Sequence, residues 1–347
     1  MTKVNTKLYY KFTELTNHNF SLNSRFSIKQ KELKLKKQMK NKKHVFEIAE
    51  IEYRCTWIEN SNYDSSKPTL IIPTKNMSRL IKKTILNLEE NEIDQLCNII
   101  IVDDMSDENI KKISKNHSYL RVENDKGFNF SMLNNIAALI CMKKGNKKII
   151  LWNNDLYIHT KSMFKELIKR HDDNLSSISG SKLLYPPLEL SFIKEKDSKN
   201  IQEYYQHVSG KWRNTVQYGG TIFLPIAPDV QTLTPYHYKR FAQHTDPRVD
   251  CDKGVSCITG ALMIIQMKDF VELGGLNPSL SKNFQDIDFC LRAVSEEKKC
   301  YYFGKDIYFY HDESVSLSGK KIGDSQLRSD EILFGKIWNK KIGKIVI

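Results

Sequence analysis

Hydrophobic and polar positions alternate along the middle of the chain with two different periods. Short runs of β-branched and aliphatic residues, each bounded by polar turn residues, predict buried strands. These runs are TLIIP (69–73), CNIIIVDD (97–104), YLRVEN (119–124) and KKIILW (147–152). Between them, MSRLIKKTILNLEE (77–90) and SMLNNIAALICMKK (131–144) carry apolar residues at helical spacing. This alternation predicts an α/β fold with a mostly parallel sheet that is flanked by helices.

The two ends of the chain lack this alternation. Residues 1–66 are polar and basic, show no clear periodicity, and run into the linker-like sequence ENSNYDSSKP (59–68). The sequence LRSDEILFGKIWNKKIGKIVI at the other end predicts a helix and a tail that pack on the core. The expected divisions are a basic N-terminal extension (1–66), an α/β domain (67–316) with halves 67–158 and 159–316, and a C-terminal helix and tail (317–347).

Composition narrows the class of protein. Of the 347 residues, 40% are hydrophobic and 27% are charged, as in an ordinary soluble globular protein. No apolar run approaches the length of a membrane-spanning helix, and the N-terminus lacks the apolar segment of a signal peptide. The seven cysteines are scattered and form no CxxC pair, which favours a reducing cytosol over a disulfide framework or a zinc site.

The net charge of +13 is concentrated near the N-terminus, where residues 1–66 carry 13 Lys and Arg against 7 Asp and Glu. The run KQKELKLKKQMKNKK (29–43) predicts a basic helix or a disordered arm. A solvated lysine-rich face is the simpler interpretation, and attraction to anionic lipid head groups is the alternative. No recognition motif for nucleic acid accompanies the charge, so nucleic acid is not an expected partner.

Polar residues follow every one of the predicted strands. The loops are PTKN (73–76), DDMSD (103–107), NDKGFNFS (124–131) and NND (153–155). In open α/β sheets, ligands bind outside the carboxyl ends of the strands. We therefore expect a ligand site along this edge of the sheet.

Asp155 and His311 are candidate ligands of a divalent cation. Asp155 lies between apolar strands in ILWNNDLYI, where a carboxylate is costly to bury unless it is paired or binds a metal. With Asn153 or Asn154 it offers the oxygen ligands that suit Mg2+ or Mn2+. His311 follows a late aromatic strand, and its imidazole would suit Mn2+ better. A plain Asn/Asp turn and an ordinary hydrogen-bonded histidine are the alternatives.

The other candidates are two acidic pairs and a glycine. Asp103 and Asp104 end a buried strand, where one could accept a hydrogen bond from a nucleobase N–H while the other caps the next segment, unless both only cap. Gly260, in SCITGALMII, would let a ligand approach the backbone, or it marks a β-bulge. Asp286 and Asp288, in KNFQDIDFCLRA, begin an apolar run with helical spacing, where acids also serve as caps.

In their order along the chain, these segments resemble a family 2 glycosyltransferase of the rhamnosyltransferase-like, O-antigen and capsule branch. The motifs are TLIIPTKN, IIIVDDMSD, NDKGFNFSMLNNIAA, IILWNNDLYI, SKLLYP, CITGALMIIQMKDFVELGGLNPSL, FQDIDFCLRA and YHDESVS, and the resemblance spans residues 67–338. It implies the GT-A fold, in which a Rossmann-like nucleotide-binding half is joined to an acceptor-binding half. It also implies transfer of a sugar from a nucleotide donor to a hydroxyl, with inversion and with Mn2+ or Mg2+ as cofactor.

The resemblance further implies roles for individual residues. Asp286 matches the catalytic base, which takes the proton from the attacking acceptor hydroxyl. Asp155 and His311 match the metal ligands, and the metal handles the charge of the diphosphate leaving group. The nucleotide-binding positions are Pro73, Thr74, Asn76, Asp104 or its neighbour Asp103, Lys126, Asn134 and Asn154. The acceptor-side positions are Gly260, Tyr218 and Asp288.

Asp288 is expected to orient its helix or to contact the acceptor, with Arg292 one turn further as its ion-pair partner. Three positions depart from the family pattern. Gln285 stands where an acid or Asn is common, Asn153 and Asn154 replace the first acid of the metal motif, and Tyr218 replaces a frequent histidine.

Two other functions are possible for such a chain. A sugar nucleotidyltransferase is disfavoured because PTKNMSRL contains no glycine to cradle phosphates. A GT-A-like module that binds nucleotide without catalysis is the other alternative. The expected partners are a UDP- or dTDP-linked sugar and a saccharide acceptor, free or lipid-linked. The expected location is the cytoplasm, with peripheral contact at the inner face of the cell membrane as a further hypothesis.

Overall fold

Strands and helices alternate through the first half of the α/β domain, as the apolar pattern predicts. The computed structural model describes residues 23–38, 43–192, 212–225, 233–312, 325–339 and 341–345. Its strands are β1 (Asn23–Gln38), β2 (Lys43–Ile58), β3 (Thr69–Thr74), β4 (Asn98–Asp104), β5 (Ser118–Glu123), β6 (Lys148–Trp152), β7 (Leu156–Ile158), β8 (Ile178–Leu184), β9 (Val216–Tyr218), β10 (Thr221–Pro225), β11 (Leu233–His237), β12 (Asp252–Gly254), β13 (Leu262–Gln266) and β14 (Cys300–His311). Its helices are α1 (Ser78–Glu90), η3 (Ile93–Gln95), α2 (Ile110–Ile113), α3 (Phe130–Lys144), α4 (Lys161–Asp173), α6 (Met267–Glu272), α7 (Gln285–Ser295), α8 (Ser325–Trp338) and α9 (Ile342–Ile345).

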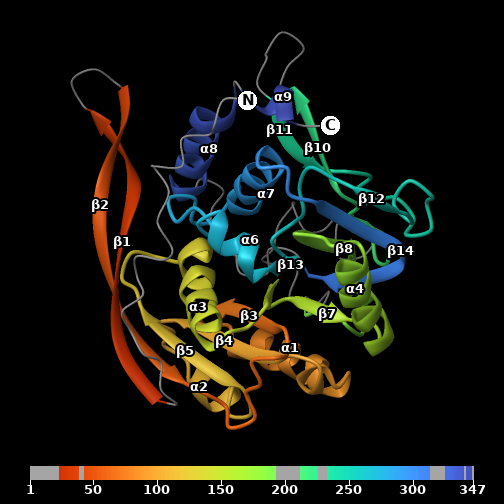
Figure 1. Cartoon of the computed structure of the whole chain (residues 1–347), viewed down its shortest axis with the longest axis horizontal. Helices are drawn as coiled ribbons and strands as arrows, with labels where there is room; N and C mark the ends of the chain where they lie inside the picture. Colours follow the sequence, from red (N-terminus) through yellow and green to blue (C-terminus); the bar gives the residue numbers. More distant parts are fainter. Residues whose placement is uncertain are drawn as a thin grey trace.

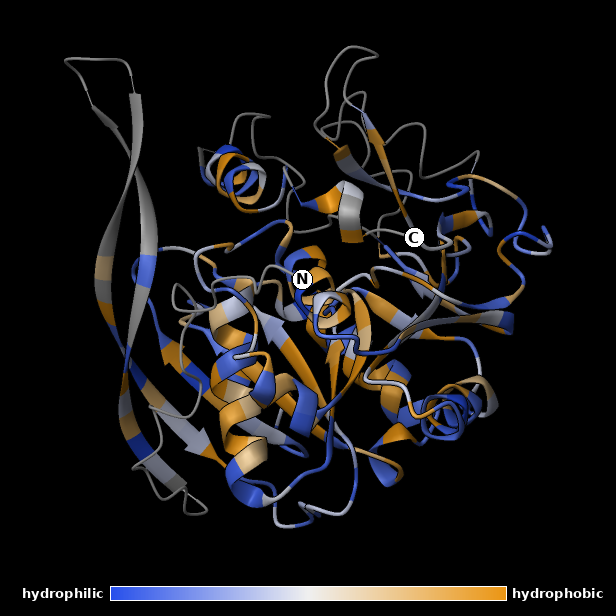
Figure 2. Ribbon diagram, turned by 45° about the horizontal axis from the view of Figure 1, so that its top comes forward, coloured by the Kyte–Doolittle hydropathy of each residue, from blue (hydrophilic) through white to orange (hydrophobic). Residues whose placement is uncertain are grey.

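Within the described residues, one sheet has the strand order β1-β2-β5-β4-β3-β6-β13-β8-β14-β12 (Figure 1). The predicted strands β3, β4, β5 and β6 pair in parallel at its centre. Every residue of β3 and β4 is buried, because helices cover both faces of a parallel sheet and select near-continuous apolar runs. Figure 2 shows the same concentration of hydrophobic residues in the central strands.

Helix α3 packs against β3, β4 and β6. Its residues from Phe130 to Cys141 are all buried, so its sequence is apolar around most of its circumference. The Asn129 side chain accepts a hydrogen bond from the Met132 N–H and begins the helix, and Gly145, with φ of 87°, ends it. The predicted helices 77–90 and 131–144 are thus confirmed.

An antiparallel strand joins the two halves of the domain into one sheet. β13 pairs with β6, with Leu262 opposite Trp152, and on its other side it pairs with β8. β14 runs parallel to β8 and ends at His311. The carboxyl ends of β3, β6, β8 and β14 therefore lie along one edge, while the flanking strands make the whole sheet mixed.

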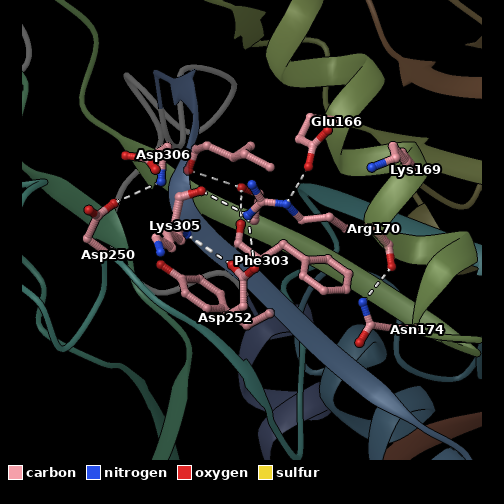
Figure 3. A network of polar contacts seen from close by, with 12 residues as sticks. Glu166, Lys169, Arg170, Asn174, Asp250, Asp252, Phe303, Lys305 and Asp306 are labelled. Carbon is pink, nitrogen blue, oxygen red and sulfur yellow. Dashed lines mark hydrogen bonds and ion pairs between the residues drawn. The ribbon is translucent and has the colours of Figure 1, made fainter.

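A network of polar contacts joins α4 to β12 and to β14 in the second half of the domain (Figure 3). The Arg170 guanidinium binds the Glu166 carboxylate at 2.8 Å and the Asp252 carboxylate at 2.9 Å. Behind it, the fully buried Lys182 ammonium lies 2.6 Å from the Asp250 carboxylate, which also accepts a hydrogen bond from the Asp306 N–H. These contacts fix the loop before β12 to the sheet.

The basic run 29–43 is not a helix or a disordered arm where the structure describes it. Its residues up to Gln38 belong to β1, which forms a long ribbon with β2 at one side of the molecule (Figure 1). β2 also pairs with β5, from Arg54 opposite Glu123 to Ile58 opposite Tyr119. Trp57 and Tyr53 are buried, so this part of the N-terminal extension belongs to the core of the α/β domain.

The predicted C-terminal helix is confirmed as α8, followed by the short α9. Residues 1–22 of the predicted extension and 317–324 of the predicted C-terminal segment lie outside the described residues. In the part of the chain that the structure describes, no helix is both long enough and apolar enough to span a bilayer.

Candidate functional site

A series of hydrogen bonds links the loops at the carboxyl edge of the sheet. The Asn154 amide after β6 donates to the Thr74 hydroxyl at the end of β3, over 3.1 Å. The Asn153 N–H donates to the Ala261 carbonyl, and the neighbouring Gly260 N–H donates to the Asp286 carboxylate at 2.7 Å. The ends of β3 and β6, the start of β13 and the start of α7 therefore form one connected region.

Asp155 and His311 meet in this region. Their atoms Oδ1 and Nε2 are 3.0 Å apart, and both residues are buried. The Asn153 amide nitrogen lies 3.2 Å from the same Nε2, while His311 Nδ1 lies 3.4 Å from the amide oxygen of Gln217. In the neutral imidazole, these two amide contacts favour a proton on Nδ1, which donates to Gln217, and a lone pair on Nε2.

This arrangement brings two electron-pair donors face to face. Within the described residues, Asp155 Oδ1 is buried and accepts no hydrogen bond. A carboxylate oxygen and an imidazole lone pair 3.0 Å apart repel each other unless a proton or a cation lies between or beside them. The donor set therefore fits a divalent cation of the Mn2+ type. Among the described residues no third His, Cys, Asp or Glu completes a cluster, so amide oxygens, water or a substrate would supply the further ligands.

The two aspartates that end β4 have different surroundings. Asp103 accepts hydrogen bonds from the Ser106 N–H, the Tyr119 hydroxyl and the Arg121 guanidinium. Its oxygens are thus occupied by the loop and by β5, and Asp103 is the member of the pair that caps.

Asp104 faces the carboxyl edge instead. It accepts hydrogen bonds from the Lys75 ammonium at 3.1 Å and from the Asn124 amide at 2.9 Å. Burial raises the pKa of Asp104, which Asn124 and Lys75 partly counteract. Both Asp104 oxygens are thus bound within the protein and its side chain is fully buried, so a nucleobase would reach Asp104 only by displacing Lys75 or Asn124. Lys75 is a member of this group that the sequence interpretation passed over, although it lies between Thr74 and Asn76.

The other predicted nucleotide-side residues lie at different depths. Asn76 has a left-handed backbone with φ of 55° and accepts a hydrogen bond from the Asp107 N–H, joining the loops after β3 and β4. Pro73 is buried within β3. Lys126 is exposed next to Asp125. Asn134 is fully buried inside α3, where its amide donates to the Phe130 carbonyl.

Asp286 is held at the start of α7 by backbone donors. One carboxylate oxygen accepts from the Gly260 N–H at 2.7 Å, and the other accepts from the Ile287 N–H at 2.8 Å. Burial raises the pKa of Asp286 to about 6, although these two hydrogen bonds lower it. A Cβ at Gly260 would lie 3.2 Å from the Asp286 Cβ, so the glycine permits this close approach.

Asp288 and Tyr218, predicted on the acceptor side, are both buried within the protein. Asp288 is fully buried, where it accepts hydrogen bonds from the Arg292 guanidinium at 3.0 Å and from the Trp338 indole at 2.9 Å. The pair with Arg292 is confirmed, and Asp288 orients α7. The Tyr218 hydroxyl is buried too and donates to the Cys257 carbonyl. Alternate residues of a strand face opposite sides, so Gln217, not Tyr218, reaches the site through His311.

These features define an α/β domain of the GT-A class, with its polar side chains gathered at the carboxyl edge of the sheet. Residues 69–224 match the model of glycosyl transferase family 2. The family and the fold class predicted from the sequence are both confirmed. A comparison with curated proteins gives no match.

Two solved structures also resemble the chain. The mannosyltransferase PcManGT from Pyrobaculum calidifontis, in complex with GDP-Man and Mn2+, is 12% identical, with 75% of this chain and 60% of that chain covered and a TM-score of 0.44. Residues 1–349 of S. aureus TarS, in complex with UDP-GlcNAc, are 14% identical, with 72% and 61% covered and a TM-score of 0.44. The chain thus spans 60% and 61% of the lengths of these two structures.

Proposed function

We propose that this chain transfers a sugar from a nucleotide-sugar donor to a hydroxyl of a saccharide acceptor, with inversion at the anomeric carbon. The observation that carries the proposal is the connection between the half-buried Asp286 carboxylate and the pair formed by Asp155 and His311. Gly260 binds Asp286, and the next residue, Ala261, accepts a hydrogen bond from Asn153, two positions before Asp155. A proton acceptor and a place for the diphosphate then lie along the same edge.

Recognition of the nucleotide is proposed for the loops after β3, β4 and β5. A uracil or thymine base carries an imide N–H, which a carboxylate such as Asp104 accepts. Lys75, whose side chain is 32% exposed, lies beside Asp104 and supplies a positive charge for a base carbonyl or a phosphate. This chemistry fits a UDP- or dTDP-linked donor. Thr74, Asn76 and Asn154 support the loop, and Lys126 is a further contact for the donor.

Asp155 and His311 are proposed to hold Mn2+ or Mg2+. When bound, the cation acts as a Lewis acid that stabilises the negative charge of the departing nucleoside diphosphate. The chain contributes the two ligand atoms, and Gln217 holds the His311 ring so that Nε2 faces Asp155.

Asp286 is proposed as the general base. The acceptor oxygen attacks the anomeric carbon, the bond from that carbon to the diphosphate oxygen breaks, and the hydroxyl proton passes to Asp286. A single displacement of this kind inverts the anomeric centre. With a pKa of about 6, the carboxylate is ionised at neutral pH yet basic enough to accept the proton as the bond forms.

The acceptor is proposed to be a surface glycan or a lipid-linked saccharide that is extended in the cytoplasm. The charge of residues 1–66, with 13 Lys and Arg against 7 Asp and Glu, supports peripheral contact with an anionic membrane surface, where a lipid-linked acceptor would be found. Binding to vesicles that contain anionic lipid, compared with neutral vesicles at the same ionic strength, tests this contact.

A thermal-shift screen tests the donor class. A ligand that binds only the folded chain at 100 times its Kd stabilises it by about 2.7 kcal/mol. We expect UDP- or dTDP-sugars to raise the Tm with Mn2+ present, and GDP- and CMP-sugars to have no effect. Donors that bind should then be hydrolysed slowly or transferred to an acceptor. Binding without any turnover would instead identify a module that has lost catalysis.

The pH dependence of transfer provides a separate prediction. Asp286 must be ionised to act as a base, and burial raises its pKa from the usual 3.8 to about 6. We therefore expect kcat/KM for the acceptor to rise with pH up to about 6 and then level off. A rate profile at constant ionic strength checks this. An acid limb near pH 4 would contradict the buried state of the carboxylate.

A further inference from the structure

The C-terminal helix α8 contacts the start of α7 at three positions spaced four residues apart. Asp330, Phe334 and Trp338 lie on one face of α8, because residues four apart in a helix are neighbours. Each of them touches the segment that carries Asp286. All three are buried, so this face of α8 is covered by the domain.

Asp330 makes the first of these contacts. One of its oxygens accepts hydrogen bonds from two consecutive backbone N–H groups, those of Lys282 at 2.7 Å and Asn283 at 3.0 Å. Its other oxygen accepts from the Gln326 amide at 2.8 Å. The carboxylate is fully buried, so its removal would take from these two backbone donors the acceptor that they share. The segment it binds ends three residues before Asp286.

The other two contacts continue along the same face. The Phe334 ring stacks on the Phe284 ring, with centroids 4.7 Å apart and planes 18° apart. Phe284 precedes α7 and has a left-handed backbone with φ of 63°, a conformation that is costly for an aromatic residue. The Trp338 indole donates to Asp288, which is itself paired with Arg292. Asp286 thus lies between two residues, at 284 and 288, that α8 fixes.

From these contacts we propose that α8 positions the catalytic carboxylate and that Asp330 is the positioning residue on which this depends. Asp330 does not touch the reacting atoms. It acts by fixing the backbone of 282–283, which sets where α7 begins and so where the Asp286 oxygens face the acceptor. This inference rests on the proposed function for its kinetic consequence, while its structural part stands on the contacts alone.

Substitution at Asp330 tests the proposal. We expect Asp330→Ala to lower kcat by about 10–100-fold, as a small misplacement of a reacting group does. The KM and Kd for the nucleotide donor should stay within about twofold of wild type, because the nucleotide loops lie on other elements. Rates are to be normalised to the fraction of chains that bind nucleotide, so that partial unfolding does not count as lost catalysis.

Conservative and control variants separate positioning from general stability. Asp330→Asn keeps a carbonyl oxygen for the two backbone N–H groups and should restore kcat to within about threefold of wild type. Glu331→Ala changes the neighbouring exposed acid on α8 and should leave kcat unchanged. If Asp330→Ala does not fold, Asp330→Ser, which keeps a shorter hydroxyl acceptor, replaces it with the same expected loss of kcat.

Hydrogen exchange supplies the readout that does not depend on activity. In Asp330→Ala the amides of Lys282 and Asn283 should exchange faster than in wild type, and in Asp330→Asn they should not. If the wild-type chain transfers no sugar but this exchange pattern is found, the proposed function is rejected, while the fixing of the 282–283 backbone by Asp330 still holds. Unchanged exchange, or a kcat for Asp330→Ala equal to that of Glu331→Ala, would overturn the positioning role.

Discussion

Replacing Asp286 with asparagine is expected to lower kcat for sugar transfer by about 10²–10⁴-fold, the contribution typical of a general base. The amide cannot accept the proton of the acceptor hydroxyl at neutral pH. Asn also carries an amide NH2 group where Asp286 has a second oxygen, so it accepts from only one of the Gly260 and Ile287 N–H groups. Steady-state kinetics with saturating donor measures the loss.

The affinity for the nucleotide separates this effect from damage to the fold. Asp286 is bound to α7 and to the start of β13, not to the loops after β3 and β4. We therefore expect the Kd for the nucleoside diphosphate to change less than twofold in Asp286→Asn. Asp173→Asn, which changes an exposed acid at the end of α4 away from the nucleotide loops, is the matched control and should keep full activity. An Asp286→Asn variant with more than about a tenth of wild-type kcat would show that another group takes the proton.

The second large effect is expected at the cation pair. Replacing His311 with alanine removes one of the two side-chain ligand atoms and leaves Asp155 Oδ1 as the other. Removing a residue that only hydrogen-bonds a metal ligand lowers metal affinity by about 10–100-fold. Removing the ligand itself should lower it at least as much. Calorimetric titration of UDP and dTDP, with and without Mn2+, should show the Mn2+-dependent gain in affinity falling by at least that factor.

Two further variants define the origin of this effect. Gln217→Leu keeps the ligand but removes the acceptor of the His311 Nδ1 proton, and it should give a smaller loss, of about tenfold. His159→Ala removes an exposed histidine at the end of β7, near Tyr308, and should change nothing. Equal affinity for nucleotide with and without Mn2+ in the wild type would reject the cation role of the pair.

Much of the fold follows from local pattern. The apolar runs at β3, β4 and β6 are continuous because both faces of a parallel sheet are buried, and such runs are visible in one dimension. Helix α7 begins at Gln285, as the spacing in FQDIDFCLRA predicts. Because each run is followed by polar residues, the edge of the sheet that carries the site is also visible in the sequence.

The N-terminal ribbon shows where this reasoning failed. Lysines dominate the composition of 29–43 and suggested a solvated helix or arm. Ile51, Tyr53, Cys55 and Trp57 alternate with other residues in β2. This period-two pattern predicts a strand, but it covers only a short part of the extension. Its meaning depends on β5 as a pairing partner, and pairing between distant segments is not encoded in either strand alone.

Which residue types reach the carboxyl edge can be read from the amino-acid sequence, because strand and helix periods and the polar residues after each strand are local properties. Which of these side chains face one another depends on the folded arrangement. It distinguished Asp104 from Asp103 and Gln217 from Tyr218, because neighbouring residues in a chain point in different directions once a strand or loop is formed. It also brought α8 against α7, through contacts between residues about fifty positions apart that no local pattern contains.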